Sequence, residues 1–329
     1  HLYARRQRQM CIRDRLRTDR SWQIDLPQAV IDELLALIPN LQGIPLEQLR
    51  KDDCPLPAFH DLANRVRGEL FAGRGLVQLR RVPVERLSQD DISLAYWALG
   101  THIGIGVSQS YKGDRLGQVR DLGEGGRYYT VGGALEMHMD PVDVVGLICV
   151  KPAIAGGESR LVSSAAVRDA IAFDYPDIVP LLEAGFHYAS RAEDRAAGAP
   201  PMTPHRVPVF SEIEGRPASF LLPIAVRNTE SSGYRLSAAE KEALALLNTV
   251  SNRPDLCFEM ELEPGDVQFL NNRLIFHGRN DYQDAEALDE KRLMLRLWLM
   301  MPDWPPRPPE QGMHAHHDRA GGGIAAQET

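Results

Sequence analysis

The sequence predicts a mainly β protein with inserted and flanking helices, an α+β chain built on a jelly-roll core. From residue 117 onward, short β-rich runs alternate with Gly, Pro and Asp turns. Helical periodicity is instead strongest before residue 100 and returns only in a few insertions. No internal repeat is visible. Many short strands with inserted helices are typical of a jelly roll.

The composition is that of an ordinary soluble domain. The chain has 329 residues, 43% hydrophobic and 25% charged, with a formal net charge of -8. Since β-sandwiches often reach ~250 residues as one unit, we expect a single domain over residues 21–301. Mild acidity favours neither nucleic acid nor an anionic membrane as a partner, and no apolar run approaches the ~20 residues that span a bilayer. The four cysteines form no CxxC pair, which predicts reduced thiols and a cytoplasmic protein.

Both ends differ from the middle. Residues 1–20 are crowded with arginine, and residues 10–15 resemble the translation of a sequencing adapter. We therefore expect residues 1–20 to be a non-native, disordered extension, with a basic nucleic-acid arm as the alternative. Residues 302–329 are rich in Pro, Gly and His, which predicts a disordered tail. Weak metal binding by its histidines, His314, His316 and His317, is the alternative.

The first hundred residues predict helices around one strand. Apolar residues at helical spacing over 27–38, after Pro27, indicate a first helix, and residues 59–71 a second. The glycines around Arg74 end the second helix, and residues 76–79 form a strand. Ser88 has the residue type of a helix N-cap, with residues 92–100 as the body of a third helix.

The remaining elements are mostly short strands. A buried strand is predicted over 144–150 and a further helix over 236–247, where Ser237 and Glu240 form a capping box. A turn at 263–266 separates two strands. The other predicted strands are 159–162, 257–262, 267–270 and 292–300, and the other predicted helices are 165–172 and one beginning at 176–182.

His138 and Asp140 are the strongest chemical signal in the chain. Being two residues apart, they leave the same face of an extended strand and could grip one metal ion from one side. His277 is the candidate third ligand. Two histidines and a carboxylate with open positions form the facial triad of non-haem Fe(II) oxygenases. A three-ligand zinc site with bound water remains an alternative, as does a His-x-Asp pair with no metal.

Two arginines near the end of the domain suggest a buried anion. Strand alternation puts Arg292, Met294, Arg296 and Trp298 on one face and four leucines on the other. The leucine face belongs to the core. An arginine fork suits a carboxylate bidentately, and the neighbouring Met and Trp favour a buried anion over a solvated strand face.

These blocks together resemble the taurine dioxygenase family, the TauD/TfdA-like 2-oxoglutarate-dependent oxygenases. The resemblance covers roughly residues 75–300 and is strongest over 131–174 and 262–299. Its blocks are His138-Met139-Asp140, Gly156-Gly157-Glu158-Ser159, Pro264-Gly265-Asp266, Asn272-Arg273 with His277, and the Arg292 to Arg296 strand. It implies a double-stranded β-helix fold, Fe(II), 2-oxoglutarate as cosubstrate and O₂.

The resemblance also implies roles for single residues. His138, Asp140 and His277 would be the iron ligands. Arg292 would pair with the distal carboxylate of 2-oxoglutarate, and Arg296 would lie near its iron-bound end. Ser159 replaces a threonine that in relatives bonds the distal carboxylate.

The chain departs from taurine dioxygenase in the spacing between His277 and Arg292, and it retains the metal-binding carboxylate, Asp140. Arg292 follows His277 by 15 positions, a few more than in taurine dioxygenase, and the extra residues fall in a loop at 283–290. Halogenating relatives lose the metal-binding carboxylate, so the presence of Asp140 argues against halogenation.

The expected activity is oxidative decarboxylation of 2-oxoglutarate to succinate and CO₂, coupled to hydroxylation of a small polar or anionic molecule. Desaturation or cyclisation would begin with the same hydrogen abstraction. Candidate substrate-binding residues are Tyr111, Arg120, Arg127 and Tyr128, with loop packing as the alternative. A cupin-like isomerase, lyase or hydrolase without 2-oxoglutarate, and a non-enzymatic binding jelly roll, remain open. A homo-oligomer is also possible.

Overall fold

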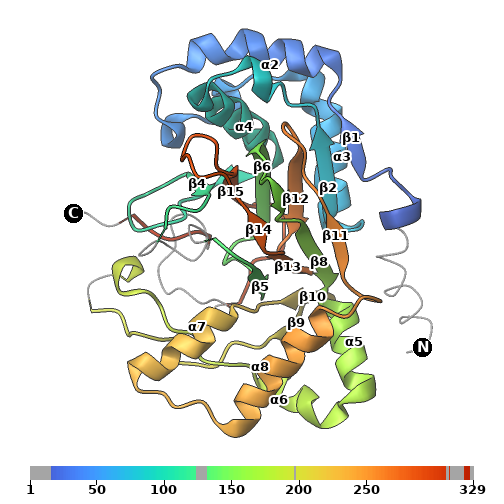
Figure 1. Cartoon of the computed structure of the whole chain (residues 1–329), viewed down its shortest axis with the longest axis vertical. Coiled ribbons are helices and arrows are strands. Elements are labelled where there is room, and N and C mark those ends of the chain that lie inside the picture. The colour runs from blue at the N-terminus through green and yellow to red at the C-terminus, as the bar shows by residue number, and fades with distance from the viewer. Residues whose placement is uncertain (1–15, 124–131, 196–197, 309–310, 312–321, 327–329) are drawn as a thin grey trace.

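The computed structural model describes residues 16–123, 132–195, 198–308, 311 and 322–326. Helices lie at both ends of the molecule and strands fill the middle (Figure 1). Strands of two sheets contribute the residues of an inner hydrophobic cluster, which includes Val145, Leu161, Phe258 and Met294. The predicted jelly-roll arrangement of α+β elements is therefore confirmed.

The larger sheet has seven strands in the order β1-β2-β12-β6-β15-β3, with β4 also paired to β15. All its pairings are antiparallel except that of β1 with β2. Its strands are β1 (Gln23–Asp25), β2 (Leu76–Arg80), β3 (Ile105–Gly106), β4 (Leu116–Val119), β6 (Val144–Lys151), β12 (Val267–Asn271) and β15 (Leu293–Met300).

The smaller sheet has four antiparallel strands in the order β11-β8-β13-β5. They are β5 (Leu135–His138), β8 (Ser159–Ser163), β11 (Phe258–Met260) and β13 (Ile275–Arg279). Two small antiparallel pairs complete the described strands: the hairpin of β9 (Phe210–Ile213) with β10 (Arg216–Ser219), and β7 (Ala155–Gly156) with β14 (Tyr282–Gln283), which are distant in the sequence.

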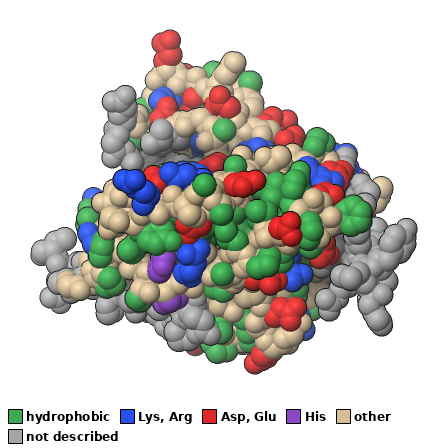
Figure 2. Space-filling view, turned by 90° about the horizontal axis from the view of Figure 1, so that it is seen from below, with side chains coloured by type: hydrophobic (Ala, Val, Ile, Leu, Met, Phe, Trp, Pro, Cys, Tyr) green, Lys and Arg blue, Asp and Glu red, His purple; other side chains and the backbone are tan. Residues whose placement is uncertain are grey.

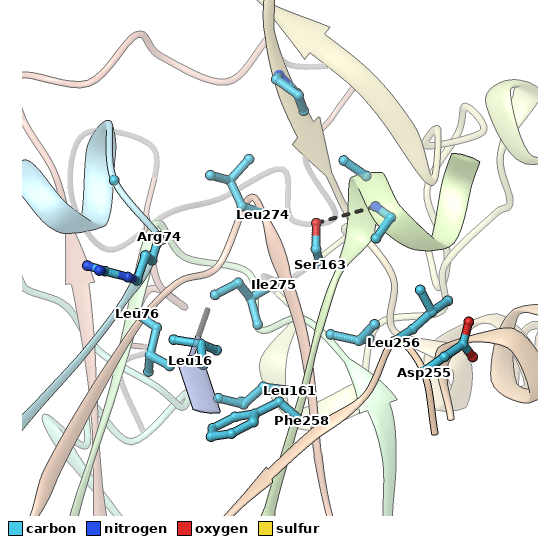
Figure 3. A pocket seen from close by; sticks show the side chains of 15 residues that line it. Leu16, Arg74, Leu76, Leu161, Ser163, Asp255, Leu256, Phe258, Leu274 and Ile275 are labelled. Atoms are coloured by element: carbon cyan, nitrogen blue, oxygen red, sulfur yellow. Dashed lines mark hydrogen bonds between the residues drawn. The ribbon is translucent and has the colours of Figure 1, made fainter. Parts of the chain in front are cut away.

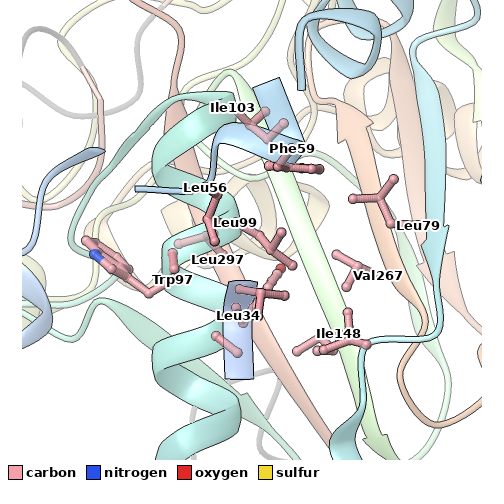
Figure 4. Packing of buried hydrophobic residues seen from close by; sticks show 14 of the residues in the cluster. Leu34, Leu56, Phe59, Leu79, Trp97, Leu99, Ile103, Ile148, Val267 and Leu297 are labelled. Atoms are coloured by element: carbon pink, nitrogen blue, oxygen red, sulfur yellow. The ribbon is translucent and has the colours of Figure 1, made fainter. Parts of the chain in front are cut away.

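Three helices cover the outer face of the larger sheet. They are α2 (Gln28–Leu41), α3 (His60–Phe71) and α4 (Gln89–Ile103). Figure 4 shows Leu34 and Leu99 from these helices packed towards Val267 and Leu297 of the sheet. Burial of this apolar surface at roughly 25 cal/mol per Å² holds the layer in place. As predicted, the leucines of β15 lie in this cluster.

A second helical layer covers the smaller sheet. It contains α5 (Ser164–Asp174), α6 (Val179–Ala184), α7 (Pro223–Arg227) and α8 (Ala238–Ser251). The predicted capping box at Ser237 and Glu240 is present at the start of α8. Phe276 of β13 points into the cluster between these helices and the sheet. None of the described helices has the length and apolar character needed to cross a membrane.

The structure differs from the sequence predictions at both ends of the chain. Leu16 is buried, and its carbonyl accepts a hydrogen bond from the indole of Trp22. Within the segment expected to be a loose tail, Trp304 and Ile324 are both buried, and the Ile324 amide donates to the carbonyl of Ser108. These apolar side chains bury surface that the surrounding Pro and Gly do not, so the described parts of both segments pack on the domain.

Candidate metal centre

Neighbouring strands bring the three expected metal ligands together. His138 is the last residue of β5, and it pairs directly with His277 of β13. Side chains of directly paired residues leave the same face of a sheet, and the two imidazole centroids lie 4.3 Å apart. Asp140 follows immediately after β5, with its Oδ2 3.9 Å from His277 Nε2. His277 lies within β13, a strand that was not among those predicted from the sequence.

The donor set is compact and enclosed. One candidate ligand atom from each of the three residues lies within 4.8 Å of the other two. All three side chains are buried. His138 Nδ1 lies 2.8 Å from the Glu136 carbonyl; because that carbonyl can only accept, Nδ1 carries the proton. The lone pair of Nε2 is then available for a metal, which is the usual arrangement of a metal-binding histidine.

Burial keeps both histidines neutral. It lowers the pKa of His138, and it lowers the pKa of His277 to about 3 with further help from His138. Burial alone would raise the pKa of Asp140, but the charge of Arg296 and the hydrogen bond from Trp298 help to hold that pKa below its usual value. Neutral imidazoles and an ionised carboxylate are the protonation states that a divalent cation requires.

Two side chains of strand β15 donate hydrogen bonds to the Asp140 carboxylate. Arg296 Nη1 donates to Asp140 Oδ1 at 3.1 Å, and Trp298 Nε1 donates to Oδ2 at 3.1 Å. Arg296 is itself oriented by Gln109, whose Oε1 accepts from Nε at 2.8 Å. Outer partners of this kind fix the direction in which a carboxylate faces a metal. Arg296 therefore contacts the candidate ligand Asp140 directly.

Asn272 fixes the backbone around Asp140. Its side-chain amide donates to the carbonyls of Asp140 and Val142, and its Oδ1 accepts from the Asp140 amide at 3.3 Å. The buried pair Asp143–Arg273 secures the same turn, with Arg273 Nη2 2.6 Å from Asp143 Oδ1. Sequence reasoning gave Asn272 and Arg273 no role, although both belonged to a matching block.

Breaking the Asp143–Arg273 pair should cost more than breaking a surface pair. Asp143 accepts from Arg273 Nε and Nη2 and from the Met301 amide. We expect Asp143→Asn to lower the free energy of unfolding by about 3–5 kcal/mol, because Arg273 would keep a buried charge without its counter-ion. Urea denaturation measures this.

The matched control is Asp303→Asn, because Asp303 pairs with Arg67 at the surface and its side chain is 57% exposed. An exposed pair contributes only about 0–1 kcal/mol. Equal losses in the two variants would contradict a special role for the buried pair.

Arg292 lies in an environment that suits an anionic ligand. It is 4% exposed, and its Nη1 has no hydrogen-bond partner within the described residues. Burial, and then the charge of Arg279, lower its pKa to about 10. The Gly156–Gly157 segment packs against it: a Cβ on Gly157 would lie 3.4 Å from Arg292 Nε. A buried cation of this kind needs a carboxylate or similar anion to offset its desolvation.

Ser159 faces the same interior. It begins β8 and pairs directly with Arg279 of β13, two residues after His277. By strand alternation Ser159, Arg279 and His277 share one face of the smaller sheet. Ser159 is therefore on the His277 face of the smaller sheet, and Arg292 packs against Gly157, two residues before Ser159.

The expected substrate residues have a mixed outcome. Tyr111 is partly buried, and its backbone amide donates to Asp194 Oδ1 at 3.2 Å. Arg120 follows β4 and donates to the carbonyl of Leu288. Arg127 and Tyr128 lie outside the described residues. The observed contacts of Tyr111 and Arg120 belong to loop packing, and their role towards a substrate stays a prediction.

A separate apolar cavity of about 170 Å³ lies elsewhere in the fold. Figure 3 shows Leu161, Leu274 and Ile275 around it, with Arg74 and Asp255 on opposite sides. None of the three candidate metal ligands lines this cavity. It is therefore distinct from the candidate metal centre.

The chemistry of these residues fits Fe(II) and 2-oxoglutarate. Two neutral imidazoles and one carboxylate on one side of a cation match the donor set of non-haem iron sites. The buried Nη1 of Arg292, which has no partner within the described residues, is a donor suited to a second, distal carboxylate. The same interior thus offers both a metal site and an anion site.

Comparisons with known proteins agree with this chemistry. FR-33289 synthase from Streptomyces rubellomurinus is 30% identical over 290 residues, which is 84% of this chain and 85% of that protein. Asparagine oxygenase, solved with Fe(II), a hydroxyasparagine and succinate, superposes with a TM-score of 0.63 at 16% identity, covering 88% of this chain and 98% of that one. The non-haem iron oxygenase OrfP, solved with Fe, succinate and a hydroxyarginine, gives a TM-score of 0.61 at 15% identity over 84% and 94% of the two chains.

Residues 42–298 match the family described as "Taurine catabolism dioxygenase TauD, TfdA family". This span contains both sheets except β1 and the end of β15, together with the three candidate ligands and Arg292. The structural matches identify the jelly roll as the double-stranded β-helix of these oxygenases. The chain belongs to the TauD/TfdA family and is a 2-oxoglutarate-dependent non-haem iron dioxygenase.

Proposed function

We propose that this dioxygenase hydroxylates a small polar or anionic molecule, with His138, Asp140 and His277 as its iron ligands. The observation that carries the proposal is the convergence of these three buried donors in a fold that also buries Arg292, whose Nη1 has no partner within the described residues. Bound iron with 2-oxoglutarate and O₂ would supply the oxidising power, with succinate and CO₂ as the coproducts.

The protein's own groups would position and shield the reactants. Arg292 would bind the distal carboxylate of 2-oxoglutarate by its guanidinium fork, with the Ser159 hydroxyl as an additional donor. Arg296, Trp298 and Gln109 would keep Asp140 oriented. Because the site is enclosed by the two sheets, water would be largely excluded from the substrate carbon.

A free amino acid is the first substrate class to examine. Two structural relatives carry hydroxylated amino acids in their solved complexes, and the family itself leaves the substrate open. Basic and acidic side chains are interspersed with hydrophobic ones on the face shown in Figure 2, which favours a small-molecule partner over nucleic acid. The described cysteines are buried and free, which supports a cytoplasmic setting.

Anaerobic incubation tests the proposed site. Purified protein with Fe(II) and 2-oxoglutarate should give a weak metal-to-ligand charge-transfer absorption, and in air it should couple O₂ uptake to succinate release. A screen of amino acids, sulfonates, betaines and other small carboxylates should stimulate succinate release by the right substrate. Bound iron without the absorption band would reject the assignment of the cosubstrate site.

A further inference from the structure

Tyr282 packs against Arg279, Arg292 and Gly157. It belongs to β14, which pairs with β7 at Gly156. Its ring centroid lies 5.3 Å from the guanidinium carbon of Arg292 and 4.6 Å from that of Arg279. A Cβ on Gly157 would approach the Tyr282 Cβ to 3.3 Å. Tyr282 is thus packed into the corner where Arg292 and the glycine turn meet.

The hydroxyl of Tyr282 is buried and has no hydrogen-bond partner within the described residues. A buried polar group left in this state costs about 1–3 kcal/mol, so its presence calls for an explanation. Burial raises the pKa of Tyr282 despite the two nearby arginines. The phenol is therefore protonated at neutral pH and offers one O–H donor.

The Tyr282 hydroxyl and Arg292 Nη1 are both buried hydrogen-bond donors. Within the part of the chain that the structure describes, neither has an acceptor, and both lie in the same corner of the fold. Asp284, a carboxylate whose charge acts on both groups, uses Oδ1 to accept from the backbone amides of Ala285 and Arg292. Its Oδ2 has no hydrogen-bond partner among the described residues. Within the described residues no acceptor serves both donors, so a bound carboxylate is the group that could satisfy them together.

The cation–π contacts explain why tyrosine suits this position. A guanidinium over an aromatic face gains about 0.5–2 kcal/mol, so the ring offsets part of the cost of burying two arginines. Phenylalanine would provide the same stacking. Only the hydroxyl adds a directed donor, and packing alone does not require it.

We infer that Tyr282 is a specificity residue for the cosubstrate, whose hydroxyl donates to the same distal carboxylate as Arg292. The inference rests on the proposed function, because it presupposes that 2-oxoglutarate binds with that carboxylate at Arg292. It adds a third donor to Arg292 and Ser159. The tyrosine would thus favour 2-oxo acids that end in a carboxylate over those that end in a methyl group.

Binding of two cosubstrates to Tyr282→Phe tests this inference. Anaerobic Fe(II) protein is titrated with 2-oxoglutarate and with 2-oxovalerate, which has the same length but lacks the distal carboxylate; the charge-transfer absorption reports Kd. We expect Tyr282→Phe to raise the Kd of 2-oxoglutarate about 10-fold or more, since hydrogen bonds to charged groups are the stronger ones. The Kd of 2-oxovalerate should change less than about 2-fold, because it cannot use the donor.

Tyr96→Phe is the matched control. The Tyr96 hydroxyl is also buried without a partner, but it lies in the outer cluster between α4 and the larger sheet. That variant should leave both Kd values unchanged. Thermal unfolding of both variants without cosubstrate shows whether either has lost its fold.

The outcomes separate this inference from the proposed function. If the unchanged protein binds 2-oxoglutarate, Arg292→Ala loses it and Tyr282→Phe binds it as before, Tyr282 only packs and the inference is wrong. Equal weakening of both 2-oxo acids by Tyr282→Phe would also reject it. No binding by the unchanged protein would instead contradict the proposed function.

Discussion

Asp140→Asn should lose Fe(II) binding and, with it, succinate formation. The substitution keeps the shape of the side chain and one oxygen for the donors on β15, but it removes the negative charge from a three-residue donor set. We expect iron affinity to fall by more than about 100-fold, beyond the 10–100-fold that loss of an outer partner typically costs. Equilibrium dialysis against Fe(II) under anaerobic conditions measures the affinity, and succinate release measures turnover.

Asp266→Asn provides the control for a buried carboxylate elsewhere. Asp266 is 5% exposed and accepts from Gln78 and from the Glu263 amide. No contact between Asp266 and the triad is seen within the described residues, so this variant should bind iron normally. Normal iron binding by Asp140→Asn would remove Asp140 from the ligand set.

The residue types of the metal site could be predicted from the sequence, but the convergence of the three side chains in space could not. A His-x-Asp pair on an extended segment predicts two groups on one face. The third ligand depends on the register of β5 with β13, in which His138 opposes His277. Neither strand was predicted, because Glu136 and His138 in β5 and His277 and Arg279 in β13 interrupt the apolar pattern that marks a strand. Polar residues that face a buried site interrupt the apolar pattern, so the strands that carry such a site are difficult to predict from the sequence.

The supporting residues were harder to anticipate for a related reason. Asn272 acts through backbone groups of Asp140 and Val142, and sequence spacing does not reveal which backbone groups a side chain reaches. The contact between Tyr282 and Arg292 depends on β14, a strand of only two residues that follows β13 after a short loop. The face of β15, by contrast, was predicted correctly, since strict alternation of leucine with larger polar or aromatic residues has only one reading.

Arg292→Met should abolish cosubstrate binding while leaving the protein without ligand at least as stable. Burial lowers the pKa of Arg292 to about 10, below its value in the unfolded chain, so at neutral pH its charge opposes folding. That penalty is present below the folded pKa and fades only as pH rises above it. Replacing this buried cation, for which the described residues form no ion pair, by an apolar side chain of similar length is therefore expected to raise the unfolding free energy, by about 1–3 kcal/mol.

The affinity of Arg292→Met for 2-oxoglutarate should fall, although its unfolding free energy rises. Loss of the guanidinium leaves the distal carboxylate of 2-oxoglutarate without its charge partner, a change that typically costs about 2–5 kcal/mol, or roughly 30-fold to several thousand-fold in Kd. Anaerobic titration with 2-oxoglutarate gives the Kd, and urea denaturation without ligand gives the stability. Arg292→Lys, which keeps a charge but not the fork, should fall between the two.

Only a binding role for Arg292 predicts opposite signs for these two measurements. An arginine kept for structure would lose stability on replacement, and its effect on binding would follow from that loss. A cupin-like enzyme that uses no 2-oxoglutarate would show neither the binding nor its disappearance. Arg292→Met protein that is both less stable and still able to bind 2-oxoglutarate would therefore remove the anion site from the interior of this fold, whatever metal the triad holds.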